Sequence, residues 1–467
     1  MTTLRSSLNQ LSMVSILLMS MSLTPTHADA HGGLGHIQVT AWAAENLPPG
    51  ELRAFLANEQ VFNSLLFGAA YPDIGYYPGL KYPELAREFA EFSHWPPFIE
   101  SFAQWIREND PPPWRTLESR KRVAFLLGCA AHGYQDEVFD SLFLDQVHFH
   151  DDKGQTEADP ASDGFLVMDL LLATVPDGDI PVNALLSLYN GSGVFDEEIV
   201  EDHLLSSMKT MTDLYIDEDA GPLLATVATN GLLEELIWTR ENYMNPDIPG
   251  SLHSEIYPTM FYMEGLWKRM NGDYSDSDVV AFTFPESPRR LRSHDASAPD
   301  SWVSYLFASG IAQSELTATW QDSSGEPVAF NQRGPAWGGD WPRLMRLTPT
   351  EDLVPGGYYS STITGTVNGV GDNTWNIDHT IEFQVNCTED NSEACGDTAV
   401  LAPAKLDGAE AFRSEWADVV EENSEPGDPE GESSGCAATG RPPLELILLG
   451  FVVYLLRRKS AFPNQAS

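Results

Sequence analysis

The feature that most constrains this chain is an apolar segment over residues 125–136 that carries a histidine and an aspartate at helical spacing. The apolar residues predict an α-helix, and His132 and Asp136 stand four residues apart near its end. Residues with this spacing lie one above the other on a helix, so the imidazole and the carboxylate can bind a single cation. Taken alone, such a pair is more often a buried histidine satisfied by a carboxylate of its own helix. Further motifs are needed to decide between the two interpretations.

The charge balance of the chain argues against nucleic-acid binding. Of its 467 residues, 69 are Asp or Glu and 26 are Lys or Arg, which gives a net charge of −43. A surface with this excess of negative charge repels polyanions, so we expect no stable nucleic-acid partner. The length of the chain is enough for about two or three domains, each with its own core.

The N-terminal residues 1–30 have the features of a secretory signal peptide. Arg5 precedes an apolar run over residues 11–23, and the small residues Ala28-Asp29-Ala30 follow. Cleavage after this motif leaves His31 as the first residue of the mature protein. The sequence therefore predicts an exported protein.

The C-terminal part of the chain predicts an acidic linker and a short membrane segment. Residues 391–440 are rich in acidic and small residues and have few apolar ones, so we expect an exposed, disordered linker. Within residues 441–467, the apolar run 446–456 is shorter than the roughly twenty residues of a stable span, which indicates a weak or transient membrane segment. The order of Gly435-Cys436, apolar run and Arg457-Arg458-Lys459 resembles the C-terminal sorting signals of myxobacterial surface proteins. This resemblance implies a place at the cell surface, in the outer membrane, or release after processing. A tail-anchored periplasmic enzyme is the alternative.

Helical periodicity dominates residues 31–275. Apolar residues recur there at intervals of three and four, which predicts an all-α domain. The prolines at 96–97 and 111–113 are expected between helices rather than inside them. The expected helices cover residues 37–46, 52–67, 85–92, 98–106, 120–131, 164–173, 181–189, 197–215, 220–243 and 254–270.

A different pattern follows over residues 276–390. Short β-prone runs alternate there with turns rich in Gly, Pro, Asn and Asp, which predicts a β-sandwich. The order of its segments resembles that of bacterial immunoglobulin-like modules. Cys387 and Cys395 are close enough in sequence to close a small disulfide loop, which export would permit.

Four further segments place His or Asp at a predicted helix end or turn. They are His31-Gly32-Gly33-Leu34-Gly35-His36, Gly68-Ala69-Ala70-Tyr71-Pro72-Asp73, Phe92-Ser93-His94-Trp95 and Asp159-Pro160-Ala161-Ser162-Asp163, the last of which is expected to open a helix. Singly, each is more often a helix cap or a solvated turn. In this order, together with His132 and Asp136, they indicate a pocket in which several ligands converge.

With these motifs, the segment from about His31 to Met270 resembles the zinc-dependent phospholipase C family. That family includes the N-terminal domain of glycosylphosphatidylinositol-specific phospholipase D, and its fold is similar to that of the fungal single-strand-specific nucleases. The resemblance implies an all-α catalytic domain that holds up to three zinc ions and hydrolyses a phosphate ester.

Carried over position by position, the resemblance implies two zinc sites. The ligands of the first site are Asp73, His94, His132 and Asp136. The second of them is held by His36 and by the mature N-terminal residue His31, through its free amine and carbonyl. An amide nitrogen in the precursor cannot coordinate as a free amine does, so this site forms only after the signal peptide is removed. Asp136 can also bridge from the first site to a neighbouring ion.

The third metal position departs from the family pattern. Where family members carry two imidazoles and an acidic residue, this chain carries Asp140, Asp159 and Asp163. Carboxylates favour Ca²⁺, Mg²⁺ or Mn²⁺ over zinc, or leave the position empty. His148 and His150 supply nitrogen ligands instead if the loop that carries them folds back. A protein that has lost its activity through these changes is a further alternative.

The resemblance implies an exported phospholipase C-like phosphodiester hydrolase that acts on phospholipid head groups at a membrane surface. Its catalytic group is a metal-activated water, which Asp73 orients or deprotonates. Two alternatives stay open: a nuclease of the related fold, and a non-catalytic surface protein that keeps one structural metal. The sequence does not determine the head group or the oligomeric state.

Overall fold

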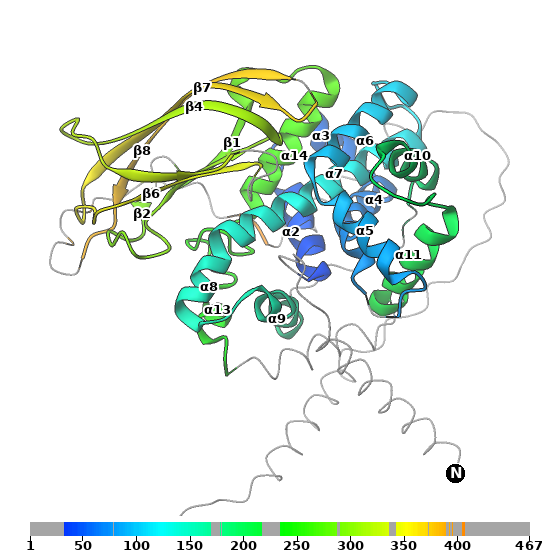
Figure 1. Ribbon diagram of the computed structural model, residues 1–467, viewed down its shortest axis with the longest axis horizontal. Helices are drawn as coiled ribbons and strands as arrows, with labels where there is room; N and C mark the ends of the chain where they lie inside the picture. The colour runs from blue at the N-terminus through cyan, green and yellow to red at the C-terminus, as the bar shows by residue number, and fades with distance from the viewer. Residues whose placement is uncertain are drawn as a thin grey trace, which may run out of the picture. The chain divides into compact units, whose positions relative to one another are not determined.

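The computed structural model describes residues 32–77, 79–169, 178, 180–216, 234–286, 290–335, 342–371, 373–388, 392, 395 and 404–406 (Figure 1). The predicted signal peptide, His31, most of the predicted linker and the predicted membrane segment lie outside these residues. Within the described ranges, no helix is long and apolar enough to cross a membrane. The predicted disulfide between Cys387 and Cys395 is confirmed.

The described residues between Gly33 and Asn271 are mainly helical, as predicted (Figure 1). Both this region and the β-rich region that follows belong to one unit of the chain, Met1–Glu422. The helical elements are α2 (Gly33–Asn46), α3 (Glu51–Leu56), α4 (Glu59–Ala70), the 3-10 helix η1 (Pro72–Gly75), α5 (Pro83–Ser93), α6 (Pro96–Asn109), α7 (Leu117–Val138), the π-helical turn η2 (Phe139–Phe143), α8 (Leu144–Asp151), α9 (Gln155–Met168), α10 (Val182–Ser192), α11 (Glu201–Ile216), α13 (Ile237–Asn242) and α14 (Ile256–Asn271).

Two helix boundaries differ from the prediction because of local hydrogen bonding. The single helix expected over residues 52–67 is two helices, since the Asn58 side chain accepts from the backbone N–H groups of Gln60 and Val61 and starts α4 anew. The prolines at 96–97 do not separate helices but begin α6. A proline at the first position of a helix loses no intrahelical bond, because the first N–H groups have no partner there.

The segment from Asp159 to Asp163 was expected to open a helix, but it does not. It lies inside α9, which begins at Gln155 and contains Pro160. The Glu157 carboxylate accepts a hydrogen bond from the Gly154 N–H at 3.2 Å, which fixes the start of the helix ahead of the proline.

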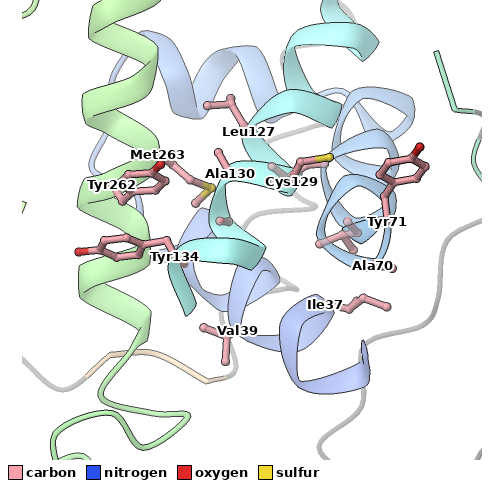
Figure 2. Packing of buried hydrophobic residues seen from close by; sticks show 14 of the residues in the cluster. Ile37, Val39, Ala70, Tyr71, Leu127, Cys129, Ala130, Tyr134, Tyr262 and Met263 are labelled. Atoms are coloured by element: carbon pink, nitrogen blue, oxygen red, sulfur yellow. The ribbon is translucent and has the colours of Figure 1, made fainter. Parts of the chain in front are cut away.

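Most residues of helix α7 are buried. It packs against α4, α14, α6 and α2, and Figure 2 shows its side chains between Tyr262 and Met263 of α14 on one side and Ala70 and Tyr71 on the other. Glycines let α4 and α7 approach closely: a Cβ on Gly68 would lie 2.2 Å from the Phe125 carbonyl oxygen. This contact brings the residues that follow α4 next to the C-terminal half of α7.

The β-rich region contains two four-stranded sheets, in the orders β1-β3-β6-β5 and β2-β8-β7-β4. Tyr305 of the first sheet and Ile363 of the second belong to one apolar cluster, so the sheets share a core. The strands are β1 (Val280–Phe284), β2 (Arg290–Leu291), β3 (Val303–Phe307), β4 (Ile311–Asp322), β5 (Phe330–Arg333), β6 (Leu344–Pro349), β7 (Tyr358–Gly369) and β8 (Thr374–Val385).

The first sheet is covered on both faces. Tyr305 and Met345 face the second sheet, whereas Phe282, Leu306 and Leu344 belong to the apolar cluster of the helical region. Every residue of β3 is therefore buried, and its sequence does not alternate between apolar and polar residues. The sheet joins the helical region directly at α14 and α7.

Candidate metal centre

Five of the predicted ligands lie together in the interior of the helical region. The end of α5 provides His94 as its C-cap residue, and the 3-10 helix η1 provides Asp73. All five side chains are buried, and they form two overlapping groups of His and Asp whose donor atoms lie close enough to bind a metal ion. The five residues are His36 of α2, Asp73 of η1, His94 after α5, and His132 and Asp136 of α7.

Two histidine nitrogens and the carboxylates beside them are spaced like the ligands of a metal ion. The Nε2 atoms of His94 and His132 are 3.1 Å apart, and Asp73 Oδ1 lies 3.4 Å from each of them. Asp136 Oδ2 lies 3.6 Å from His94 Nε2 and 3.4 Å from His132 Nε2. Zinc bonds of about 2.0–2.2 Å in tetrahedral geometry separate the ligand atoms by roughly 3.3–3.6 Å. The residues present therefore fit a zinc ion.

The hydrogen bonds of the rings direct the nitrogen lone pairs into this site. His94 Nδ1 lies 2.8 Å from the Ala90 carbonyl oxygen, and His132 Nδ1 lies 2.6 Å from that of Ala69. Carbonyl oxygens only accept, so each Nδ1 carries a proton, and in the neutral form of each ring Nε2 carries the lone pair. Two lone pairs that face each other at 3.1 Å repel unless a proton or a metal ion lies between them. Backbone carbonyls hold metal-ligating histidines in this way.

Asp136 lies between two sets of nitrogen donors. Its Oδ2 atom faces His94 and His132, and its Oδ1 atom lies 3.2 Å from His36 Nε2. The His36 ring stacks on that of His132 with the centroids 3.6 Å apart. A carboxylate in this position can bridge two ions, as the sequence predicts for Asp136.

The electrostatics of the cluster favour a positive charge at its centre. Burial raises the pKa of Asp73 and Asp136, but the neighbouring imidazoles, His132 above all, lower both values below the usual range. Burial lowers the pKa of His94, yet its hydrogen bond to Asp73 and the charge of Asp136 raise it to about 9. Burial and the nearby His36 lower the pKa of His132. Two ionised carboxylates among these rings therefore stabilise a proton or a cation.

The other predicted ligands are placed differently. Asp163 accepts hydrogen bonds from the backbone N–H groups of Leu34 and Gly35, at 3.2 and 2.8 Å, at the start of α2. Burial raises the pKa of Asp163 to about 7 against the effect of those two bonds. Asp140 accepts from Gln155 Nε2 at 3.3 Å, and burial and the charge of Asp136 raise its pKa well above the usual value.

Asp159 is buried on α9. Among the described residues, none of the groups of donors that could share an ion includes Asp140, Asp159 or Asp163. His31 lies outside the described residues. The structure disfavours the alternative with His148 and His150, because these residues are exposed on α8 and not on a loop that folds back.

Sequence reasoning missed two polar residues beside the cluster. Gln135 accepts from His36 Nδ1 at 2.9 Å through Oε1, and its Nε2 donates to Thr40 Oγ1 at 3.0 Å, so it fixes the His36 ring on α2. Glu255 is fully buried just before α14, and burial together with the charges of Asp136 and Asp140 raises its pKa well above the usual value. A glutamate that precedes an apolar helix is typical of a helix start, which is why it gave no signal.

Three imidazoles and two carboxylates, buried among helices, form a site that could hold a metal ion. Residues 35–148 match the sequence profile of the family described as zinc dependent phospholipase C. Over residues 35–148, this match confirms the resemblance to that family that the motifs predict.

The matches to curated relatives also cover only part of the chain. The chain is 29% identical over 123 residues to the phosphatidylinositol-glycan-specific phospholipase D of Homo sapiens, which covers 26% of this chain and 14% of that protein. It is 38% identical over 85 residues to the protein of the same name from Dictyostelium discoideum, covering 18% and 8%. The chain therefore matches only a small part of the length of these relatives.

Likeness to solved structures is weak. CopC from Methylosinus trichosporium OB3b is 20% identical with a TM-score of 0.18, covering 23% of this chain and 91% of that one. Domains 1–6 of the surface layer protein SbsC are 10% identical with a TM-score of 0.17, covering 77% and 46%. TM-scores this low do not establish a shared fold, and we draw nothing from them.

Proposed function

We propose that the protein is a metal-dependent phosphodiester hydrolase of the phospholipase C kind that acts on phospholipid head groups. The observation that carries this proposal is the pair of histidine Nε2 atoms that face each other at 3.1 Å between Asp73 and Asp136. The match of residues 35–148 to the zinc-dependent phospholipase C family supports zinc as the metal. The names of the matched relatives support a phospholipid substrate.

The proposed ligand sets follow from the distances between the donor atoms. Asp73, His94, His132 and Asp136 hold the first zinc ion. His36 and the bridging Asp136 hold the second, together with the amine and carbonyl of His31 in the mature protein. The proposed role of the remaining carboxylates is to bind a third ion, which is Zn²⁺, Ca²⁺, Mg²⁺ or Mn²⁺. These carboxylates are Asp140, Asp159 and Asp163.

A bound zinc ion supplies a Lewis acid that lowers the pKa of a water molecule toward neutrality. The residues of the chain prepare the site for that chemistry. The carbonyls of Ala69 and Ala90 hold two imidazoles in the ligating tautomer, so that the rings need not reorient on binding. Asp73 is ionised at neutral pH, because its pKa is lowered by His132, and it can orient the attacking water as a hydrogen-bond acceptor.

Export belongs to the same proposal. The signal-like residues 1–30 and the C-terminal Cys436 with its apolar and basic neighbours support a protein at the cell surface or a secreted one. In this proposal residues 31–275 are the catalytic domain, and residues 276–390 are an immunoglobulin-like sandwich. The shared core of the two sheets supports the sandwich assignment. Contact with a membrane surface follows from the proposed substrate.

The test combines elemental analysis with two substrates. The purified mature protein should contain at least one tightly bound transition metal and should release phosphorylated head groups from phosphatidylcholine or phosphatidylinositol vesicles. His132→Ala should lose both properties, whereas His150→Ala, which changes an exposed histidine of α8, should keep both. Release of nucleotides from single-stranded DNA instead would favour the related nuclease. A metal-free protein whose melting is unchanged by a chelator would exclude both hydrolases.

A second test concerns the mature N-terminus. A protein with one extra residue before His31 should fold normally and lose most of its activity, because the amine of His31 becomes an amide. Full activity of that protein would show that the amine is no ligand. The measurement is the hydrolysis rate and zinc content beside those of the mature protein.

A further inference from the structure

Arg343, which directly precedes β6, makes several hydrogen bonds with α7. Its side chain is fully buried. Its backbone N–H and its Nε donate to the two carboxylate oxygens of Glu137, at 2.6 and 2.7 Å. Its Nη2 donates to the Gly133 carbonyl oxygen. The guanidinium group of Arg343 thus binds both ends of one helical turn.

The aromatic neighbours of Arg343 join this turn to α14. The guanidinium carbon lies 6.0 Å from the ring centroid of Tyr134 and 5.8 Å from that of Tyr262. The two rings stack in parallel with their centroids 4.2 Å apart, and Figure 2 shows them facing each other between α7 and α14. Cations over aromatic rings are attracted by the ring quadrupole. The arginine is therefore held in place from two helices.

The turn that Arg343 binds is the one that carries two proposed metal ligands. His132 directly precedes Gly133, and Asp136 directly precedes Glu137. On its other side the turn touches a third ligand, because a Cβ on Gly133 would lie 2.0 Å from the His94 carbonyl oxygen. A shift of this turn would move both ligands of α7 relative to His94.

We propose that Arg343 is a positioning residue of the metal centre, and that the β-rich region thereby takes part in metal binding. Arg343 acts through Gly133 and Glu137 to set the positions of His132 and Asp136. This inference rests on the proposed function, since it assumes that the cluster binds a metal ion. A purely structural ion pair between the two regions is the competing interpretation, and metal affinity separates the two.

The experiment compares zinc affinity with stability in the mature full-length protein. Arg343→Gln should weaken zinc binding by about 10- to 100-fold, as is typical when a partner that orients metal ligands is removed. Arg343→Lys should fall between this variant and the unchanged protein, because one ammonium group cannot reproduce the fork that reaches both Glu137 and Gly133. Zinc affinity is measured by competition with a chelator, and the visible spectrum of the Co²⁺-loaded protein reports the ligand geometry.

A double variant keeps the test valid if Arg343→Gln folds poorly. Arg343→Met with Glu137→Met removes both buried charges together, so the melting temperature of the metal-free protein should largely recover. Zinc affinity should stay low and the Co²⁺ spectrum should stay altered, because Gly133 still lacks its donor. Recovery of zinc affinity together with the melting temperature would show a purely structural role and overturn the inference.

Arg269→Gln is the matched control. Arg269 of α14 forms a partly buried ion pair with Glu100 of α6, and neither residue lies on α7. This change should lower the melting temperature and leave zinc affinity within about twofold. If the unchanged protein binds no zinc, the proposed function itself fails. If it binds zinc and Arg343→Gln binds it equally well, only the positioning role fails.

Discussion

The helical region and the β-rich region bury polar side chains in different ways. The core between the two sheets is apolar and aromatic, and the polar groups at its border include the neutral hydroxyls of Ser304 and Ser361. The helical region instead buries imidazoles and carboxylates side by side, as in His36, Asp73 and His132. Buried ionisable groups are costly unless they are paired or bind an ion, and they concentrate at functional sites. The concentration of imidazoles and carboxylates in the helical region therefore points to a specific use for them there.

The largest expected effect comes from removing one histidine in each region. In His132→Ala the site loses the Nε2 atom that faces His94, so zinc content should drop and the hydrolysis rate should fall at least about 100-fold. His379→Ala removes a half-buried histidine of β8 beside Tyr305, and it should cost only about 1 kcal/mol of unfolding free energy. Elemental analysis, rate measurements and denaturation check both variants. A His132→Ala protein with full zinc content and rate would break the comparison.

A second comparison uses one glycine in each region. Gly133→Ala places a Cβ against the backbone carbonyl of His94, 2.0 Å away, which only a shift of α7 or of the His94 segment can relieve. We expect a loss of about 3 kcal/mol of unfolding free energy, together with weaker zinc binding. Gly369→Ala in β7 meets the Trp375 ring at 2.5 Å, and a side chain can move, so about 1 kcal/mol should be lost with unchanged zinc content. Urea denaturation and zinc titration measure these effects. Equal losses in the two variants would contradict this explanation.

The sequence predicts the parts of the site that short motifs encode. His132 and Asp136 share one helical face, and Asp73 and His94 each follow a predicted helix, so local spacing together with the family resemblance identifies them. Their assembly in one cluster needs the close crossing of α4 and α7, which the small residues of both helices permit. Short sequence motifs therefore identify the candidate metal ligands, and the packing of α4 on α7 brings them together.

The parts that sequence reasoning missed depend on contacts between distant segments. Arg343 reaches Glu137 across 206 residues, and nothing near Arg343 in sequence marks it as part of a metal centre. Glu255 comes near Asp136 only through the packing of α14 on α7. The burial of β3 on both faces likewise requires the helical region as a neighbour, which a strand pattern alone does not reveal.

A smaller effect tests whether the β-rich region is independent of the metal. The buried Tyr305 hydroxyl donates to Ser361 Oγ at 2.8 Å and joins the two sheets. Tyr305→Phe leaves the serine without this partner and should cost about 2 kcal/mol of unfolding free energy. Zinc affinity should not change, because neither Tyr305 nor Ser361 takes part in the hydrogen bonds that join Arg343 to α7. Thermal denaturation and zinc competition are the measurements, and a change in affinity here would show that the two regions are coupled more broadly than through Arg343.

The pH dependence of stability should have opposite signs for His94 and His379 in the metal-free protein. The pKa of His94 is about 9, above its ordinary value of 6.5, because Asp73 and Asp136 outweigh the effect of burial. His94 therefore stabilises the fold below pH 6.5, and this contribution is lost as the pH rises through about 9. Burial lowers the pKa of His379, so its contribution is present above pH 6.5 and is lost as the pH falls.

Denaturation in the presence of a chelator, from about pH 5 to about pH 9, measures both contributions as differences from His94→Asn and His379→Asn. The stability difference for His94 should shrink by about 1 kcal/mol or more toward alkaline pH. The difference for His379 should grow in the same direction. Saturating zinc should reverse the His94 slope, because bound zinc keeps His94 unprotonated in the folded state while the unfolded state still takes up a proton as the pH falls, and it should leave the His379 slope unchanged. A His94 difference that grows with pH would mean that the buried carboxylates do not hold a positive charge at this position, which would remove the electrostatic basis for a cation there.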